Sequence, residues 1–317
     1  MTDAGPQLPR PVAFVLGGGA SFGAVQVGML QALSEIDLTP DLVVGTSVGS
    51  LNGALVAEDP RGAANRLTHL WMQVTRETVF PGRVVDRMRT WRQHRTFFVQ
   101  PDGLRDLLTS TLASERIEDL ALPFAATAMD LATGRVVHLD SGPLVPALLA
   151  SAAVPGVYPS VRINDRDLVD GGVVSNVPVA QALRMGARSI VVLDCGAFRL
   201  RPETPRKLPE LVAHVVAIMM RQQVVRDVPV VAREVPVLYL PGPYRMTSSP
   251  LEFVASPRLM KEAYEKTRAF LGEVKPSGPG LYGDAPLVTG LDDPLLRDVQ
   301  RWAGPGAPAN CAGEGGG

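Results

Sequence analysis

The most constraining feature of the sequence is a pattern that occurs three times: a short run rich in β-branched residues, a glycine-containing turn, and a stretch with helical spacing. The first unit consists of residues 12–16, a turn at 17–19 and a helix over about 23–35. The second consists of residues 42–44, a turn at 45–49 and a helix to about residue 57, and the third begins at residues 189–194. Such units build mainly parallel sheets, so we expect an α/β fold with helices flanking a central sheet.

Weaker patterns predict the remaining elements. They are hairpins at residues 124–139 and around the tip 164–166, helices at about 146–153, 208–226 and 257–271, and a strand at 237–240. The last forty or so residues are rich in Pro and Gly, and we expect them to form a weakly ordered tail.

Composition excludes several classes of protein. The chain has 31 Lys and Arg against 32 Asp and Glu, which argues against a nucleic-acid binder that relies on bulk positive charge. Cys195 and Cys311 do not make a disulfide framework. The N-terminus has no apolar segment typical of a signal peptide, and the longest other apolar stretch, residues 211–220, is about half the length that spans a bilayer. We therefore expect a cytoplasmic protein.

Residues 45–49 read Gly-Thr-Ser-Val-Gly and fit the pattern G-x-S-x-G. They lie between a predicted strand and a predicted helix, which is the setting of a nucleophile elbow. There the glycines Gly45 and Gly49 allow a sharp turn that exposes the serine at the sheet edge, above a helix N-terminus. Ser47 is therefore the candidate nucleophile.

A serine needs a base, and two readings are open. In a Ser-His-Asp enzyme the chain order would leave His214 as the base, with Asp170 or Asp194 before it. However, His214 falls in the middle of a predicted helix, and the elbow follows only one βα unit. Asp170 is followed at a strand end by Gly171 and Gly172, which have no side chains, so another segment of the chain can approach the backbone there closely. This favours a Ser47–Asp170 dyad.

A third element is the glycine loop, Gly17-Gly18-Gly19-Ala20-Ser21-Phe22-Gly23, which follows the first strand and opens the first helix. Its converging N–H groups suit an anion, either an oxyanion or a phosphate. The dinucleotide fingerprint fails because Phe22 stands where its third glycine is required.

In this order and spacing, the glycine loop, G-x-S-x-G and Asp-Gly-Gly resemble the patatin-like phospholipase family, and the similarity extends through Ala153-Val154-Pro155-Gly156 and residues 170–178. The resemblance implies a three-layer patatin-like fold and hydrolysis of lipid acyl esters through an acyl-enzyme, with no metal or organic cofactor. It makes Ser47 the nucleophile and Asp170 the base, and it assigns the oxyanion hole to the N–H groups of Gly18, Gly19 and Ala20. It also implies a catalytic domain over residues 10–240 with a cap at about 60–120, a helical extension packed on it at 241–275, and the tail at 276–317.

The sequence departs from the family pattern at two positions. Ala20 stands at the third loop glycine, and Phe22 stands where an Arg or Lys is usual. Ala20 should still present its N–H, provided that its φ is negative, whereas the missing cation weakens a preference for phospholipid. The competing hypothesis is a lipid-binding or scaffold protein that keeps the fold without turnover. Asn176, which precedes Val177-Pro178, either braces the Asp-Gly-Gly turn or simply forms a turn.

Residues 83–95 contain five arginines and one acid, with Val84, Met88 and Trp91 on one helical face. A basic amphipathic helix with an interfacial aromatic residue is typical of proteins that lie on a membrane surface. We therefore expect transient, peripheral membrane contact, the alternative being that Trp91 packs on the core and the arginines are solvated. The sequence sets no oligomeric state, head group or acyl length.

Overall fold

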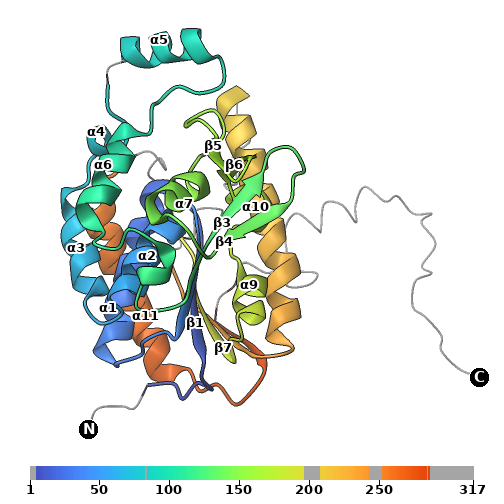
Figure 1. Ribbon diagram of the computed structural model, residues 1–317. Helices are drawn as coiled ribbons and strands as arrows, with labels where there is room; N and C mark the ends of the chain where they lie inside the picture. The colour runs from blue at the N-terminus through green and yellow to red at the C-terminus, as the bar shows by residue number, and fades with distance from the viewer. Residues whose placement is uncertain (1–4, 83, 196–207, 243–251, 284, 286–317) are drawn as a thin grey trace, which may run out of the picture. The chain divides into compact units, whose positions relative to one another are not determined.

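A computed structural model describes residues 5–82, 84–195, 208–242, 252–283 and 285. Its centre is a nine-stranded sheet in the order β5-β6-β3-β2-β1-β7-β8-β9, with β4 paired to β3 (Figure 1). The strands are β1 (Val12–Leu16), β2 (Leu42–Thr46), β3 (Phe124–Asp130), β4 (Val136–Leu139), β5 (Val161–Ile163), β6 (Arg166–Asp170), β7 (Ser189–Leu193), β8 (Pro236–Tyr239) and β9 (Gly280–Gly283). From β3 through β2, β1, β7 and β8 to β9 every pairing is parallel, whereas β4, β5 and β6 pair antiparallel.

Helices lie on both faces of this sheet. The described α-helices are α1 (Gly23–Glu35), α2 (Val48–Glu58), α3 (Ala63–Gln73), α4 (Arg76–Val79), α5 (Val84–His94), α6 (Asp102–Thr111), α7 (Leu144–Ser151), α8 (Gly172–Ser175), α9 (Val179–Arg184), α10 (Leu208–Ala232) and α11 (Ser256–Glu273), of which α5 stands away from the sheet (Figure 1). Phe14 and Leu16 of β1 pack with α1, α2 and α11, whereas Ala13 and Val15 pack with α9 and α10. Since neighbouring residues of a strand point to opposite faces, β1 is buried on both sides, and the expected three-layer α/β fold is confirmed.

The predicted elements all occur, with differences at their ends. The second strand runs to Thr46 rather than Val44, and α10 continues through Pro229 to Ala232 instead of ending near Arg226. Part of the expected tail forms β9, whose backbone pairs with β8 and so needs no apolar pattern of its own. The tail beyond Ala285 lies outside the described residues.

Helix α11, the last one in the described part of the chain, packs along α1. The two helices approach so closely at Gly28 that a Cβ there would overlap the carbonyl of Met260. Within the described residues, no helix is both long enough and apolar enough to cross a membrane.

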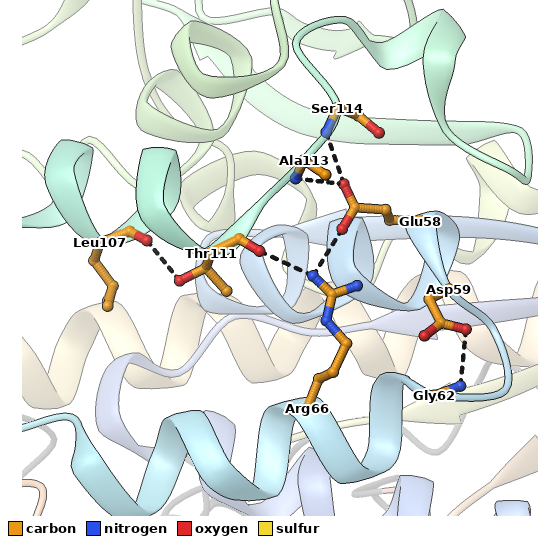
Figure 2. Close-up of polar contacts among 8 residues, drawn as sticks. All are labelled: Glu58, Asp59, Gly62, Arg66, Leu107, Thr111, Ala113 and Ser114. Atoms are coloured by element: carbon orange, nitrogen blue, oxygen red, sulfur yellow. Dashed lines mark hydrogen bonds and ion pairs between the residues drawn. The ribbon is translucent and has the colours of Figure 1, made fainter.

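A polar cluster joins the end of α2 to α3 and to the segment that follows α6 (Figure 2). Glu58, at the end of α2, accepts hydrogen bonds from the N–H groups of Ala113 and Ser114, both at 2.9 Å, and from Arg66 at 2.8 Å. Arg66 also donates to the carbonyl of Thr111 at the end of α6. Burial raises the pKa of Glu58, but the hydrogen bonds from Ser114, Arg66 and Ala113 outweigh burial, so the pKa lies below its ordinary value.

Replacing Glu58 should therefore destabilise the protein in a pH-dependent way. Because the folded-state pKa is lowered, the carboxylate stabilises the fold above the unfolded-state pKa of about 4.3, and this contribution disappears as the pH falls through the folded-state pKa. We expect Glu58→Gln to lower the free energy of unfolding by about 1–2 kcal/mol at neutral pH. Urea denaturation at several pH values measures this loss.

The matched control is Glu115→Gln, which alters an exposed carboxylate one residue beyond Ser114. The control should leave the free energy of unfolding nearly unchanged. A Glu58→Gln loss that stays the same at all pH values would contradict the assigned role of the charge.

Candidate functional site

Ser47 lies in the turn between β2 and α2, and its backbone is in an unusual conformation. Its φ is 54° and its ψ is −129°, a combination that a non-glycine residue rarely adopts. Such a conformation costs of order 1–3 kcal/mol and persists only where neighbouring structure enforces it. A strained serine between a strand and a helix is the geometry of a nucleophile elbow.

The neighbours of Ser47 hold this conformation from both sides. Its N–H donates to Ser151 Oγ at 3.0 Å, and the Ser151 hydroxyl donates to the carbonyl of Thr127 at 2.6 Å. Its carbonyl accepts from the N–H of Ser50 at 2.8 Å and from Ser50 Oγ at 2.7 Å. Both polar groups of the Ser47 backbone are therefore anchored within the protein.

The two motif glycines are required by close packing. A Cβ on Gly45 would lie 2.6 Å from the carbonyl carbon of Gly49, and a Cβ on Gly49 would lie 2.6 Å from the carbonyl oxygen of Gly17. The first helical turn of α2 thus crosses directly over the ends of β1 and β2. A side chain at either position would push the serine out of place.

Asp170 is the last residue of β6. The register of the strands places it at the same height in the sheet as the end of β2, which Ser47 follows. Thr46 pairs with Thr127 of β3, and Asp170 pairs with the next residue, Ala128. Asp170 is only 4% exposed. Its Oδ1 accepts from the N–H of Gly172 at 2.8 Å, and its carboxyl receives a hydrogen bond from the Ser47 side chain.

Burial raises the pKa of Asp170 to about 6, and the hydrogen bonds from Ser47 and Gly172 offset only part of that effect. The glycine after it is required by the neighbouring strand, because a Cβ on Gly171 would overlap the carbonyl of Thr127. The expectation that Asp-Gly-Gly permits close backbone approach is confirmed. The carboxyl group is thus held beside the serine with a basicity near that needed at neutral pH.

The glycine loop differs from expectation in two ways. The N–H of Gly18 donates to the carbonyl of Asn176 at 3.3 Å, so it is occupied within the protein. Ala20 has a φ of 52°, so the condition of a negative φ is not met; the position adopts the left-handed conformation that favours glycine. In the described part of the chain, the N–H groups of Gly19 and Ala20 meet no protein acceptor, and both residues are partly exposed.

Asn176 joins the glycine loop to the Asp-Gly-Gly turn. Its Nδ2 donates to the carbonyl of Gly18 at 3.5 Å, and its own N–H donates to Gln223 Oε1 at 2.9 Å. Gln223, on α10, also donates to the carbonyls of Gly172 and Val173 at 3.3 and 2.7 Å. The sequence interpretation missed Gln223, although a polar residue on the inward face of an apolar helix is a usable signal.

The structure also places the remaining candidate residues. His214 precedes Gln223 by nine residues on α10, about 13 Å along the helix, and has no hydrogen-bond partner among the described residues. Asp194 accepts a hydrogen bond from Tyr239 at 2.7 Å. Phe22 is buried in the core beside the loop. No group of three or more His, Cys, Asp or Glu among the described residues is arranged to hold a metal ion.

Comparisons with known proteins agree with this geometry. A family model described as patatin-like phospholipase matches residues 14–183. Patatin-like phospholipase domain-containing protein 7 of Rattus norvegicus is 30% identical over 204 residues, which cover 59% of this chain and 14% of that protein. Lysophospholipase NTE1 of Mycosarcoma maydis is 30% identical over 196 residues, covering 59% of this chain and 10% of that protein.

An uncharacterized NTE family protein of Mycobacterium bovis is 28% identical over 198 residues, covering 62% of this chain and 52% of that protein. The chain thus spans about half the length of this relative and much less of the other two. The family model matches more than half of the chain and includes both Ser47 and Asp170. The chain therefore belongs to the patatin-like phospholipase family.

Proposed function

We propose that this protein is a serine acyl hydrolase that cleaves lipid acyl esters, with Ser47 as nucleophile and Asp170 as general base. The observation that carries the proposal is the pairing of a strained, anchored serine with a buried carboxyl group whose pKa is raised to about 6. The names of two relatives, a patatin-like phospholipase domain-containing protein and a lysophospholipase, support the lipid substrate class.

In the proposed reaction, Ser47 Oγ attacks the ester carbonyl while its proton passes to Asp170. The carbonyl oxygen becomes an oxyanion, which the N–H groups of Gly19 and Ala20 stabilise. The intermediate then expels the alcohol, which takes the proton from Asp170, and leaves an acyl group on Ser47. Water, deprotonated by Asp170, releases the fatty acid and restores the serine.

Among the three N–H groups expected to form the oxyanion hole, Gly19 and Ala20 are the better supported because the Gly18 N–H is already bonded to Asn176. Phe22 adds no charge beside the loop and so does not select among lipid classes. The proposed substrate is therefore a phospholipid, a lysophospholipid or a neutral lipid. The strained Ala20 favours one alternative, a lipid-binding protein on the same fold without turnover. Hydrolysis of p-nitrophenyl esters by the wild-type protein separates the two functions.

The pH dependence of turnover tests the role of Asp170. A general base acts when it is deprotonated, so kcat/KM should rise with pH through about 6 and level off above it. Asp170→Asn should lose about 10²–10⁴-fold in kcat, because it cannot accept the serine proton. Wild-type activity that stays flat down to about pH 4, or an active Asp170→Asn variant, would rule out this base.

The same substitution should make the protein more stable. Since the folded-state pKa of Asp170 is raised, its unfolded-state carboxyl ionises first, and stability falls as the pH rises from about 4 to about 6. At neutral pH, Asp170→Asn should raise the free energy of unfolding by about 1–3 kcal/mol. Thermal unfolding of both proteins measures this gain; a lower Tm for the variant would instead indicate a structural role for the charge.

We also propose that the protein contacts membrane surfaces through α5. Figure 1 shows this helix standing away from the sheet. Val85 and Met88 are exposed, and Trp91 stacks on the exposed Phe98 rather than joining the core. The guanidinium of Arg95 lies 5.3 Å from the centre of the Trp91 ring. Exposed apolar side chains among arginines suit an anionic lipid surface.

The first turns of α10 add a second apolar surface. The exposed residues Leu208, Leu211, Val212, Val215 and Met219 follow one another at helical spacing and share one face. Further along the same helix, Gln223 contacts the Asp-Gly-Gly turn. This apolar face therefore belongs to a helix that also touches the candidate site, which favours lipid approaching from that side.

Liposome sedimentation tests the membrane proposal. Arg89→Glu/Arg92→Glu on α5 should weaken binding to vesicles containing phosphatidylglycerol by about tenfold or more, since each basic residue near an anionic surface contributes about 1 kcal/mol. Arg188→Glu/Arg233→Glu is the matched control, because these exposed arginines precede β7 and β8. Equal losses in both variants, or binding that ignores anionic lipid content, would contradict the role of α5.

A further inference from the structure

Three buried polar side chains form a continuous hydrogen-bonded chain beneath the glycine loop. They are Gln26 of α1, Asn52 of α2 and Trp71 of α3, and all are less than a tenth exposed. Trp71 Nε1 donates to Asn52 Oδ1 at 3.0 Å, and Asn52 Nδ2 donates to Gln26 Oε1 at 2.8 Å. Gln26 Nε2 then donates to two backbone carbonyls, those of Gly17 at 2.7 Å and Leu193 at 3.0 Å.

The direction of this chain is forced by its first member. An indole N–H can only donate, so Asn52 must turn its oxygen toward Trp71 and its amide nitrogen toward Gln26. Gln26 must in turn accept through its oxygen, which leaves its amide nitrogen facing Gly17. The second hydrogen of the Asn52 amide is used as well, since Nδ2 also donates to the carbonyl of Gly23 at 3.1 Å. Neither amide can flip without leaving buried groups unpaired.

The carbonyls that Gln26 binds mark the ends of the two central strands. Leu193 is the last residue of β7, and Gly17 directly follows β1. The N–H of Gly17 donates to the same Leu193 carbonyl at 3.1 Å. Gln26 therefore holds the point at which the chain leaves the sheet and enters the glycine loop.

Fixing Gly17 determines where the next peptide groups lie. Gly18 is held by its N–H to Asn176 and by its carbonyl to the Asn176 amide. The next two N–H groups, of Gly19 and Ala20, have no protein acceptor among the described residues. With Gly17 and Gly18 both anchored, these two donors are presented from a rigid base at the edge where Ser47 lies.

We propose that Gln26 is a positioning residue for the oxyanion loop, oriented through Asn52 by Trp71. The inference rests on the proposed hydrolase function. Without the Gln26 amide, the Gly17 carbonyl loses its strongest side-chain donor and the loop can shift relative to Ser47. Oxyanion donors act mainly in the transition state, so their displacement lowers kcat more than it raises KM.

The test compares Gln26→Met with Gln31→Met, both on α1. Gln31 is a matched control because its amide donates to Thr68 Oγ1 of α3 at 2.9 Å and does not contact the glycine loop. Gln26→Met should lower kcat for a p-nitrophenyl ester by about tenfold or more with KM nearly unchanged. It should also speed hydrogen–deuterium exchange in peptides covering residues 17–23, and Gln31→Met should do neither.

A second variant covers the case in which Gln26→Met does not fold. Trp71→Phe keeps an aromatic ring against Phe253, 6.0 Å away between centroids, and removes the N–H that orients Asn52 together with part of the buried ring. It should lower kcat a few-fold and speed exchange in the same peptides. Unchanged kcat and exchange in Gln26→Met, or in Trp71→Phe where Gln26→Met does not fold, would overturn the proposal, as would equal losses in Gln26→Met and Gln31→Met.

The exchange measurement keeps the two proposals distinguishable. If the wild-type protein neither hydrolyses the ester nor reacts with a fluorophosphonate, the hydrolase function fails. Faster exchange at residues 17–23 in Gln26→Met would still support the positioning role in that case, and unchanged exchange would overturn it.

Discussion

The strained backbone of Ser47 determines how the candidate site is built. A serine at φ 54° persists only because its N–H and its carbonyl are both bonded, to Ser151 and to Ser50. Those bonds require α2 to cross the strand ends closely, which in turn requires glycine at positions 45 and 49. The central parallel strands, packed on both faces, supply the rigid edge against which this crossing is held.

The electrostatics of the site follow from how few donors reach Asp170. A buried carboxylate with many hydrogen bonds would be a weak base, and one with none would stay protonated. Asp170 receives hydrogen bonds from the Gly172 N–H and from the Ser47 side chain, and burial still prevails, with a pKa of about 6. The charge therefore costs stability at neutral pH, a cost that fits a catalytic group better than a structural one.

The parts of the fold that depend on local pattern were predictable, and the parts that depend on tertiary contacts were not. Helix α1 and the elbow around Ser47 follow from the glycine turns and apolar spacing of adjacent residues. The N–H of Gly18 is engaged by Asn176, which lies far away in sequence. The φ of Ala20 is positive although this conformation favours glycine, so the residue type at this position does not reveal it. Likewise, β9 forms because β8 offers an edge, which its own residues do not reveal.

Peptide mapping by mass spectrometry after treatment with an alkyl fluorophosphonate tests whether Ser47 is the nucleophile. We expect one phosphonyl group per chain, located on Ser47 in the peptide that contains residues 45–49. Modification would require Asp170 and would be lost in Ser47→Ala. A folded wild-type protein that takes up no phosphonyl group, or carries it on another residue such as Ser151, would rule out Ser47 as the nucleophile.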